Sequence, residues 1–262
     1  MTWSPQRILV TGASSGIGRA CAVALAGQGR SVAIAYRANL DGAARTAELV
    51  RAAGAKPILF VIDCADPELA VAACQDTFQA LNGIDVLVNN AGINPRASCL
   101  DEGIAALREV LTVNALTPIA CAGAAAREMV EQGTGGRIIN ITSVHEHIPL
   151  PGGTGYCAAK AALGSATKTM ALELAGHHIT VNSVAPGEIA TGLNGILEDL
   201  DAWDIDRPAI PTKRPGSPAE VAAVVAYLAS PQASYTTGHS MVVDGGLMLT
   251  AAAPNAALAG TY

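Results

Sequence analysis

Residues 8–18 decide the fold, and they read Ile8-Leu9-Val10-Thr11-Gly12-Ala13-Ser14-Ser15-Gly16-Ile17-Gly18. The apolar run at the start predicts a buried strand, the glycines predict a tight turn, and a helix-like segment follows. Such a turn lets a pyrophosphate approach the backbone, and the start of the next helix offers unpaired N–H groups. A plain structural turn is the alternative, but the strand before it and the helix after it favour a dinucleotide site. The candidate contacts in this stretch are Gly12, Ser14, Ser15, Gly16, Ile17 and Gly18.

The same alternation of short apolar runs and helix-like segments continues along the chain. The expected strands after the first are 31–35, 57–62, 86–88, 137–142, 180–184 and 240–243, and the expected helices are 16–28, 42–53, 67–80, 105–131, 156–175 and 218–229. Nearly continuous apolar strands that alternate with helices indicate a parallel sheet covered on both faces. We therefore expect an α/β fold, with residues 1–262 forming a single doubly wound Rossmann-type domain around a seven-stranded parallel sheet.

Composition excludes several classes of protein. The 262 residues include 16 basic and 22 acidic ones, for a net charge of −6, and 50% are hydrophobic but only 3% aromatic. This balance argues against disorder, and the lack of clustered cations argues against a nucleic-acid partner. No stretch resembles a membrane span. Six cysteines without a Cys-x-x-Cys pair favour reduced thiols in a cytoplasmic protein, and the pair His145 and His147 is too small a set for a metal site.

Two stretches interrupt the alternation. Residues 188–213 lack a clear strand and are expected to form a substrate lid, since a long irregular insertion in a compact domain is usually functional. Five acidic residues fall in this region, and they either form a solvated face or disfavour anionic substrates at the lid. They are Glu198, Asp199, Asp201, Asp204 and Asp206. The apolar tail, residues 247–262, either docks on a neighbour or frays.

Tyr156 and Lys160 are four positions apart and so share one face of the helix expected there. Hydride transfer at a carbonyl or alcohol carbon needs a partner for the proton on the oxygen. A tyrosine of ordinary pKa is too basic for this near neutral pH, and a neighbouring ammonium favours the phenolate. Ser143 lies 13 positions earlier, at the end of an expected strand, where its hydroxyl could donate to the substrate oxygen.

Taken together, these motifs resemble the short-chain dehydrogenase/reductase family over most of the chain, about residues 7–246. The glycine spacing is Thr-Gly-x-x-x-Gly-x-Gly, and the matching residues follow in the family's order. They are Asp63, Asn89-Asn90-Ala91-Gly92, Asn114, Ser143, Tyr156-Cys157-Ala158-Ala159-Lys160, Pro186-Gly187 and Asp244-Gly245-Gly246. The resemblance implies a nicotinamide dinucleotide cofactor and a catalytic set of Asn114, Ser143, Tyr156 and Lys160.

The resemblance also assigns a role to each position. Lys160 would hold the nicotinamide ribose, Asn114 would kink its helix and hold a water in a proton path to Lys160, and Asp63 would meet the adenine amino group. The further cofactor contacts expected are Cys64, Asn90, Ala91, Gly92, Tyr156, Pro186, Gly187, Ile189 and Thr191. The family usually forms homotetramers through the helices that carry Asn114 and Tyr156 and through the final strand region, which implies the same assembly here.

The cofactor preference depends on the end of the second strand. NAD enzymes normally carry an acid there for the ribose, whereas this chain reads Ala35-Tyr36-Arg37-Ala38. A guanidinium can pair with a 2′-phosphate, so Arg37 favours NADP(H), with NAD as a cofactor that family members with Tyr-Arg here often accept too. The alternative is that Arg37 is an ordinary solvated residue.

The stretch Ser143-Val144-His145-Glu146-His147-Ile148-Pro149 is similar to bacterial glucose 1-dehydrogenases, as is Tyr36-Arg37. We expect His145, Asn94 and Glu188 to contact the substrate, and we predict an NADP(H)-preferring oxidoreductase of a sugar, polyol or small carbonyl or alcohol. Two alternatives stay open. One is a 3-oxoacyl-thioester reductase, which the sparse lysines and acidic lid disfavour. The other is a catalytically silent NADP(H)-binding protein.

Overall fold

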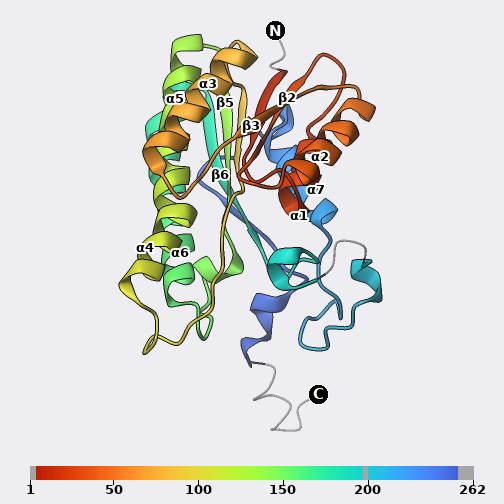
Figure 1. The fold of residues 1–262 in the computed structure, drawn as a ribbon, viewed down its shortest axis with the longest axis vertical. Helices are drawn as coiled ribbons and strands as arrows, with labels where there is room; N and C mark the ends of the chain where they lie inside the picture. Colours follow the sequence, from red (N-terminus) through yellow and green to blue (C-terminus); the bar gives the residue numbers. More distant parts are fainter. Residues whose placement is uncertain (1–3, 197–199, 253–262) are drawn as a thin grey trace.

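The computed structural model describes residues 4–196 and 200–252, and it has a seven-stranded parallel sheet at its centre (Figure 1). The strand order is β3-β2-β1-β4-β5-β6-β7. Every neighbouring pair is parallel. The strands are β1 (Arg7–Val10), β2 (Ser31–Tyr36), β3 (Lys56–Val61), β4 (Val86–Asn89), β5 (Gly136–Ile141), β6 (Ile179–Pro186) and β7 (Ser240–Val243). The order reverses after β1, so the predicted doubly wound α/β fold is confirmed.

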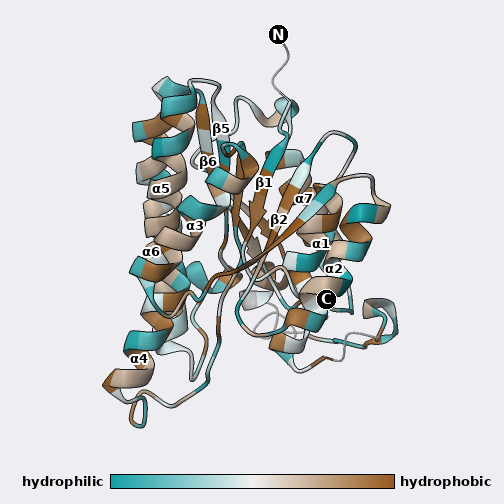
Figure 2. Cartoon of the chain, turned by 45° about the horizontal axis from the view of Figure 1, so that its top comes forward, coloured by the Kyte–Doolittle hydropathy of each residue, from teal (hydrophilic) through white to brown (hydrophobic). Residues whose placement is uncertain are grey.

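Helices cover both faces of this sheet. They are α1 (Gly16–Ala24), α2 (Leu40–Ala52), α3 (Pro67–Leu81), α4 (Ile104–Leu111), α5 (Thr117–Gln132), α6 (Thr154–Leu174) and α7 (Pro218–Leu228). In Figure 1, α3, α5 and α6 lie on one side of the sheet and α1, α2 and α7 on the other. Each side has its own apolar core, one built around residues such as Ile34 and Val225 and the other around Phe78 and Met129. Figure 2 shows the inner strands β1 and β2 as largely hydrophobic, and most of their residues are buried.

Local sequence signals place several helix ends. The Asp66 side chain accepts from the backbone N–H groups of Glu68 and Leu69 at the start of α3, and Pro67 occupies the first turn. At the start of α7, Ser217 and Glu220 form a reciprocal capping box. α5 ends at Gly133, whose φ of 67° is readily adopted by glycine. These local contacts fix where the helices begin and end.

The predicted continuous helix over residues 105–131 is wrong in one respect. A π-helical turn, Thr112–Leu116, separates α4 from α5 and contains Asn114. A π turn adds one residue to the helical repeat and so changes the direction in which the following side chains point. By length and composition alone, the whole run Ile104–Gln132 could also cross a membrane. It does not by itself indicate a span, because α5 packs against α3 and supplies Cys121 and Met129 to the core.

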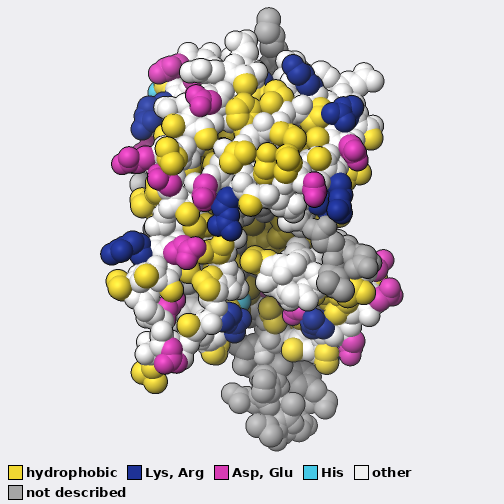
Figure 3. Space-filling model, in the orientation of Figure 1, with side chains coloured by type: hydrophobic (Ala, Val, Ile, Leu, Met, Phe, Trp, Pro, Cys, Tyr) yellow, Lys and Arg dark blue, Asp and Glu magenta, His cyan; other side chains and the backbone are white. Residues whose placement is uncertain are grey.

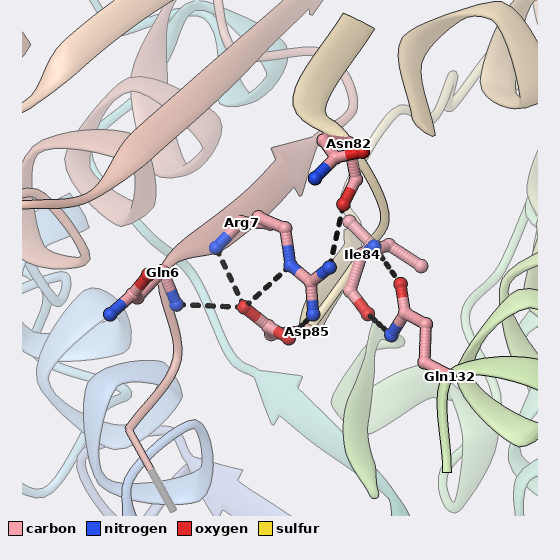
Figure 4. Close-up of polar contacts among 6 residues, drawn as sticks. All are labelled: Gln6, Arg7, Asn82, Ile84, Asp85 and Gln132. Carbon is pink, nitrogen blue, oxygen red and sulfur yellow. Dashed lines mark hydrogen bonds and ion pairs between the residues drawn. The ribbon is translucent and has the colours of Figure 1, made fainter. Parts of the chain in front are cut away.

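A polar network joins the amino ends of β1 and β4 (Figure 4). One oxygen of Asp85 accepts from the backbone N–H groups of Gln6 and Arg7, both at 2.8 Å, and from Arg7 Nε at 3.1 Å. The other oxygen pairs with Arg7 Nη2 at 2.5 Å. The Gln132 side chain donates to the Ile84 carbonyl and accepts from its N–H. These contacts fix the register of β1 and β4 at the amino ends of the strands. The glycine loop lies at the opposite end of the sheet.

Asp85→Ala is expected to lower the free energy of unfolding by about 3 kcal/mol, because it leaves two backbone N–H groups without their acceptor and leaves the Arg7 guanidinium only the Asn82 carbonyl among the described residues. Urea denaturation monitored by circular dichroism measures the change. Asp76→Ala is the matched control, since Asp76 is an exposed carboxylate on α3. Equal stabilities of the two variants would contradict the structural role given to Asp85.

Candidate active site

The glycine loop lies between the end of β1 and the start of α1, where the sequence predicted it. Gly12 and Gly16 have φ values of 63° and 50°, in the left-handed region that glycine adopts without strain. The Ser15 side chain makes no capping hydrogen bond to α1. The Ser15 side chain therefore leaves the first N–H groups of α1 available, and a helix start needs such N–H groups to bind an anion.

The loop after β4 is joined directly to the glycine loop. Thr11 Oγ1 accepts from the backbone N–H groups of Asn90 and Ala91, at 2.9 and 3.0 Å. The Asn90 side chain donates in return to the carbonyls of Thr11 and Gly12. A Cβ on Gly12 would lie 2.9 Å from the Ala91 Cα, so only glycine allows this approach. The two loops thus form one rigid floor at the carboxyl ends of the central strands.

A cleft of ≈ 470 Å³ opens beside this floor. Every predicted contact of the adenosine half of a dinucleotide lines it: the glycine-loop residues, Arg37, Asp63, Cys64, Asn90, Ala91 and Gly92. The Asp63 carboxylate also accepts from Ala65 N at 3.0 Å, which orients it. Burial raises the pKa of the Cys64 thiol to about 12, so this side chain is an uncharged part of the wall.

A second cavity, of ≈ 880 Å³, continues from the first. Ile17, Asn90, Gly92, Thr191 and Leu193 line both. Asn114, Ser143, Tyr156 and Lys160 all line the second cavity, together with Pro186, Gly187 and Ile189. Figure 3 shows a hollow in this region of the face drawn. The continuous cleft, the glycine floor and the uncapped helix start fit an extended dinucleotide with its reactive end at Tyr156.

The four candidate catalytic residues come from three separate parts of the fold. Ser143 follows β5 and caps the short helical turn Val144–Glu146. Tyr156 and Lys160 lie on consecutive turns of α6, and Asn114 lies in the π-helical turn. The Asn114 amide donates to the carbonyls of Ile93 and Val110 and accepts from Ile93 N. Asn114 therefore ties the segment that follows β4, through Ile93, to the end of α4, through Val110.

The electrostatics of Tyr156 differ from the sequence-based prediction. The sequence predicts that Lys160 lowers the pKa of Tyr156, and Lys160 Nζ does lie 5.7 Å from the ring centroid. Instead, burial raises the pKa of Tyr156, although a hydrogen bond with Ser143 opposes the shift. Burial also lowers the pKa of Lys160 to about 8, and Lys160 Nζ donates to the Ile141 carbonyl at 2.9 Å. At neutral pH this arrangement holds a protonated phenol beside a lysine, a proton donor suited to carbonyl reduction.

The three predicted substrate residues all line the second cavity. The His145 ring meets the Tyr156 ring edge-on, with centroids 6.3 Å apart, and burial lowers the pKa of His145, which favours its neutral form. The side-chain oxygen of Asn94 is buried and makes no hydrogen bond within the described part of the chain. Glu188 forms an ion pair with Arg207. Its charge is therefore neutralised locally.

Sequence reasoning missed several residues that line this cavity. Arg96, Arg207, Leu247, Met248 and Thr250 all belong to it. The three tail residues reach it because Asp244 accepts from the N–H groups of Gly246 and Met248 and turns the chain back. The tail beyond residue 252 lies outside the described residues. The pairing of Arg207 with Glu188 across 19 positions carries no sequence signal, since it depends on how the loop folds.

Of the acidic set at positions 198–206 of the predicted lid, none of the three residues that the structure describes lines the cavity. Asp201, Asp204 and Asp206 are exposed, and Asp201 caps the short turn Ala202–Asp204. Glu198 and Asp199 lie outside the described residues. No group of three or more potential metal ligands occurs within residues 4–196 and 200–252.

Comparison with known proteins defines the class. A family model described as enoyl-(acyl carrier protein) reductase matches residues 12–248. An uncharacterized oxidoreductase, YohF, of Escherichia coli is 46% identical over 244 residues, covering 93% of this chain and 96% of the relative. A crystal structure of acetoin dehydrogenase YohF from Salmonella typhimurium has 45% identity and a TM-score of 0.87 and covers 94% and 97% of the two chains.

Two further relatives bear on the substrate alternatives. A 3-oxoacyl-[acyl-carrier-protein] reductase of Synechocystis is 40% identical and a glucose 1-dehydrogenase of Gluconobacter oxydans is 35% identical, covering 93% of this chain in both cases and 97% and 92% of the relatives. The chain therefore belongs to the short-chain dehydrogenase/reductase family, as its motifs predicted. It is an oxidoreductase that acts on alcohol or carbonyl groups with a nicotinamide nucleotide.

Proposed function

We propose that this enzyme transfers a hydride between NADP(H) and a small neutral sugar, polyol or hydroxycarbonyl compound, with substrates that carry two adjacent oxygens preferred. The observation that carries the proposal is that two pairs of residues line one cavity. Ser143 and Tyr156 form the first pair. The second pair is His145, whose neutral form burial favours, and Asn94, whose buried side-chain oxygen makes no hydrogen bond within the described residues. The first pair suits the reacting oxygen, and the second pair suits a neighbouring hydroxyl. Acetoin, the compound for which the similar Salmonella typhimurium dehydrogenase is named, has this pattern.

In this proposal the nicotinamide supplies or accepts the hydride, and the chain's own residues manage the proton. The Tyr156 hydroxyl donates its proton to the carbonyl oxygen during reduction and recovers it from the alcohol during oxidation. The Ser143 hydroxyl donates a hydrogen bond to the same oxygen, which stabilises the charge that develops there. Asn114 acts at a distance by holding the loop that follows β4.

A panel assay tests the substrate class. Acetoin, diacetyl, 2,3-butanediol, glucose and a 3-oxoacyl thioester are each offered with both nicotinamide cofactors, and kcat/KM is compared. We expect the adjacent-oxygen compounds to be the best substrates. Preference for the thioester would instead support a 3-oxoacyl reductase. If no compound turns over but NADPH raises the melting temperature, the chain is a binding protein.

The preference for NADP(H) rests on Arg37. This exposed side chain lines the adenosine cleft beside Ser14 and Asn39, and no carboxylate follows β2 before Asp41. Arg37→Ala is expected to raise KM for NADP(H) about tenfold, because one charge-assisted contact is lost, and to leave KM for NAD(H) unchanged. Arg45→Ala, an exposed change on α2 outside the cleft, is the control. Equal effects on both cofactors would contradict the assignment.

We also propose a homotetrameric, cytoplasmic enzyme that binds neither nucleic acid nor membranes. Large apolar side chains are exposed on the helices expected to form the interface, namely Ile104, Leu116 and Leu172. All six cysteines are free thiols. On the face drawn in Figure 3, cationic side chains are interspersed with anionic ones rather than gathered in a patch. Light scattering after size exclusion measures the assembly, and a monomeric mass would contradict it.

A further inference from the structure

Glu146 is a buried carboxylate that takes no part in the proposed proton transfer. It ends the short turn Val144–Glu146 that begins directly after Ser143, and its side chain is only 4% exposed. The carboxylate lies against α6, because a Cβ on Gly164 would be 2.7 Å from Glu146 Oε2. Burying a charged carboxylate is costly unless other groups compensate for the lost water.

Hydrogen bonds compensate for only one of the two oxygens. Glu146 Oε1 accepts from the Ser240 hydroxyl of β7 and lies 2.8 Å from His147 Nε2. Glu146 Oε2 is buried and makes no hydrogen bond within the described residues. A nearby positive charge stabilises a carboxylate oxygen that is buried without a hydrogen bond, since Coulomb attraction is strong where water is absent.

Lys160 is a buried cationic group on the helix against which Glu146 lies. Lys160 and Gly164 are one turn apart on α6, so the carboxylate beside Gly164 and the lysine share one face of the helix. Lys160 is itself 5% exposed, and the negative charge of Glu146 raises its pKa against the larger lowering effect of burial. Two buried groups of opposite charge therefore lie on the same face of α6, and Lys160 also lines the catalytic cavity.

We propose that Glu146 is a positioning residue that keeps the Lys160 side chain protonated near neutral pH. Lys160 needs its positive charge to act on the Tyr156 hydroxyl, and burial alone works against that charge. The inference rests on the family assignment of Lys160 and not on which substrate the enzyme uses. Glu146 itself touches no reacting group.

Several other groups lie against Lys160 and Glu146. Lys160 faces the Tyr156 ring on its own helix, the Ile141 carbonyl at the end of β5, and Gly92, whose added Cβ would lie 3.6 Å from Nζ. On its other side Glu146 faces His147 and Ser240. His147 is the titratable neighbour of Glu146, so the experiment includes a variant that removes it.

The protonation of Lys160 can be measured directly. The chain has four lysines, Lys56, Lys160, Lys168 and Lys213. Protein labelled with 13C at the lysine ε carbon therefore gives a simple NMR spectrum, and Lys160→Arg identifies the Lys160 signal. The chemical shift is followed from pH 6 to 10 in the wild type, in Glu146→Gln and in Ser240→Ala. The same series is repeated in a His147→Gln background.

We expect Glu146→Gln to lower the Lys160 midpoint by about one pH unit, as loss of one nearby opposite charge does. Ser240→Ala breaks a hydrogen bond of Glu146 but keeps the charge, so its midpoint should match the wild type. An unchanged midpoint in Glu146→Gln would overturn the proposal, as would an equal shift in Ser240→Ala, which would indicate a packing effect. If Glu146→Gln does not fold, Glu146→Asp draws the charge away from Lys160, and an unchanged midpoint there overturns the proposal equally.

Discussion

Tyr156→Phe is expected to lower kcat about a thousandfold, the contribution of a positioned general acid–base group. The change removes one oxygen and keeps the ring, which is 8% exposed and packs against Val110 and Ala159. The fold and the cofactor cleft should therefore persist. Without the phenolic proton, the carbonyl oxygen keeps only the Ser143 hydrogen bond, and hydride transfer leaves an alkoxide with no group to protonate it.

Stopped-flow reduction of the best panel substrate measures this loss, and NADPH fluorescence titration checks that cofactor affinity is kept. Tyr227→Phe is the matched control, because Tyr227 lies on α7 and is 42% exposed, away from the cavity. A Tyr156→Phe enzyme that kept more than a tenth of its turnover would show that another group moves the proton.

Gly18→Ala is expected to abolish cofactor binding at working concentrations and to lower the free energy of unfolding by about 3 kcal/mol, the upper range for overpacking. An added Cβ would lie 2.3 Å from the Gly12 carbonyl oxygen and 2.5 Å from Asn90 Nδ2. The carbonyl belongs to backbone and cannot swing aside. The first turn of α1 must therefore move away from the glycine loop, the proposed binding site of the cofactor phosphates.

Gly123→Ala is the control for this substitution. Gly123 lies in α5, and an added Cβ would meet nothing within 4 Å. Alanine there should raise stability by about 0.5–1 kcal/mol, since glycine is a poor residue inside a helix. Thermal unfolding with and without NADPH compares the two variants. If Gly18→Ala kept the stabilisation by NADPH, the close packing of the two loops would not matter for binding.

The sequence by itself determined the features that depend on neighbours along the chain. Short apolar runs that alternate with helix-like segments specified seven parallel strands, because a buried strand is apolar throughout and an amphipathic helix is apolar on one face only. Ser143 at the end of a strand and the four-residue spacing of Tyr156 and Lys160 placed them correctly. The glycine loop was readable because strand, turn and helix start are contiguous.

The tertiary structure decided what depends on distant segments and on water. It showed that the kink implied at Asn114 by the family resemblance is a π-helical turn before α5, since single-residue changes in helical repeat have no periodic signal. It paired Arg207 with Glu188 and brought Leu247 to the cavity, because loop conformation joins positions far apart in the chain. It also reversed the expected pKa shift of Tyr156, since burial is a property of the packed core. For the same reason, only the folded chain shows that the Glu146 carboxylate is buried on the face of α6 that carries Lys160.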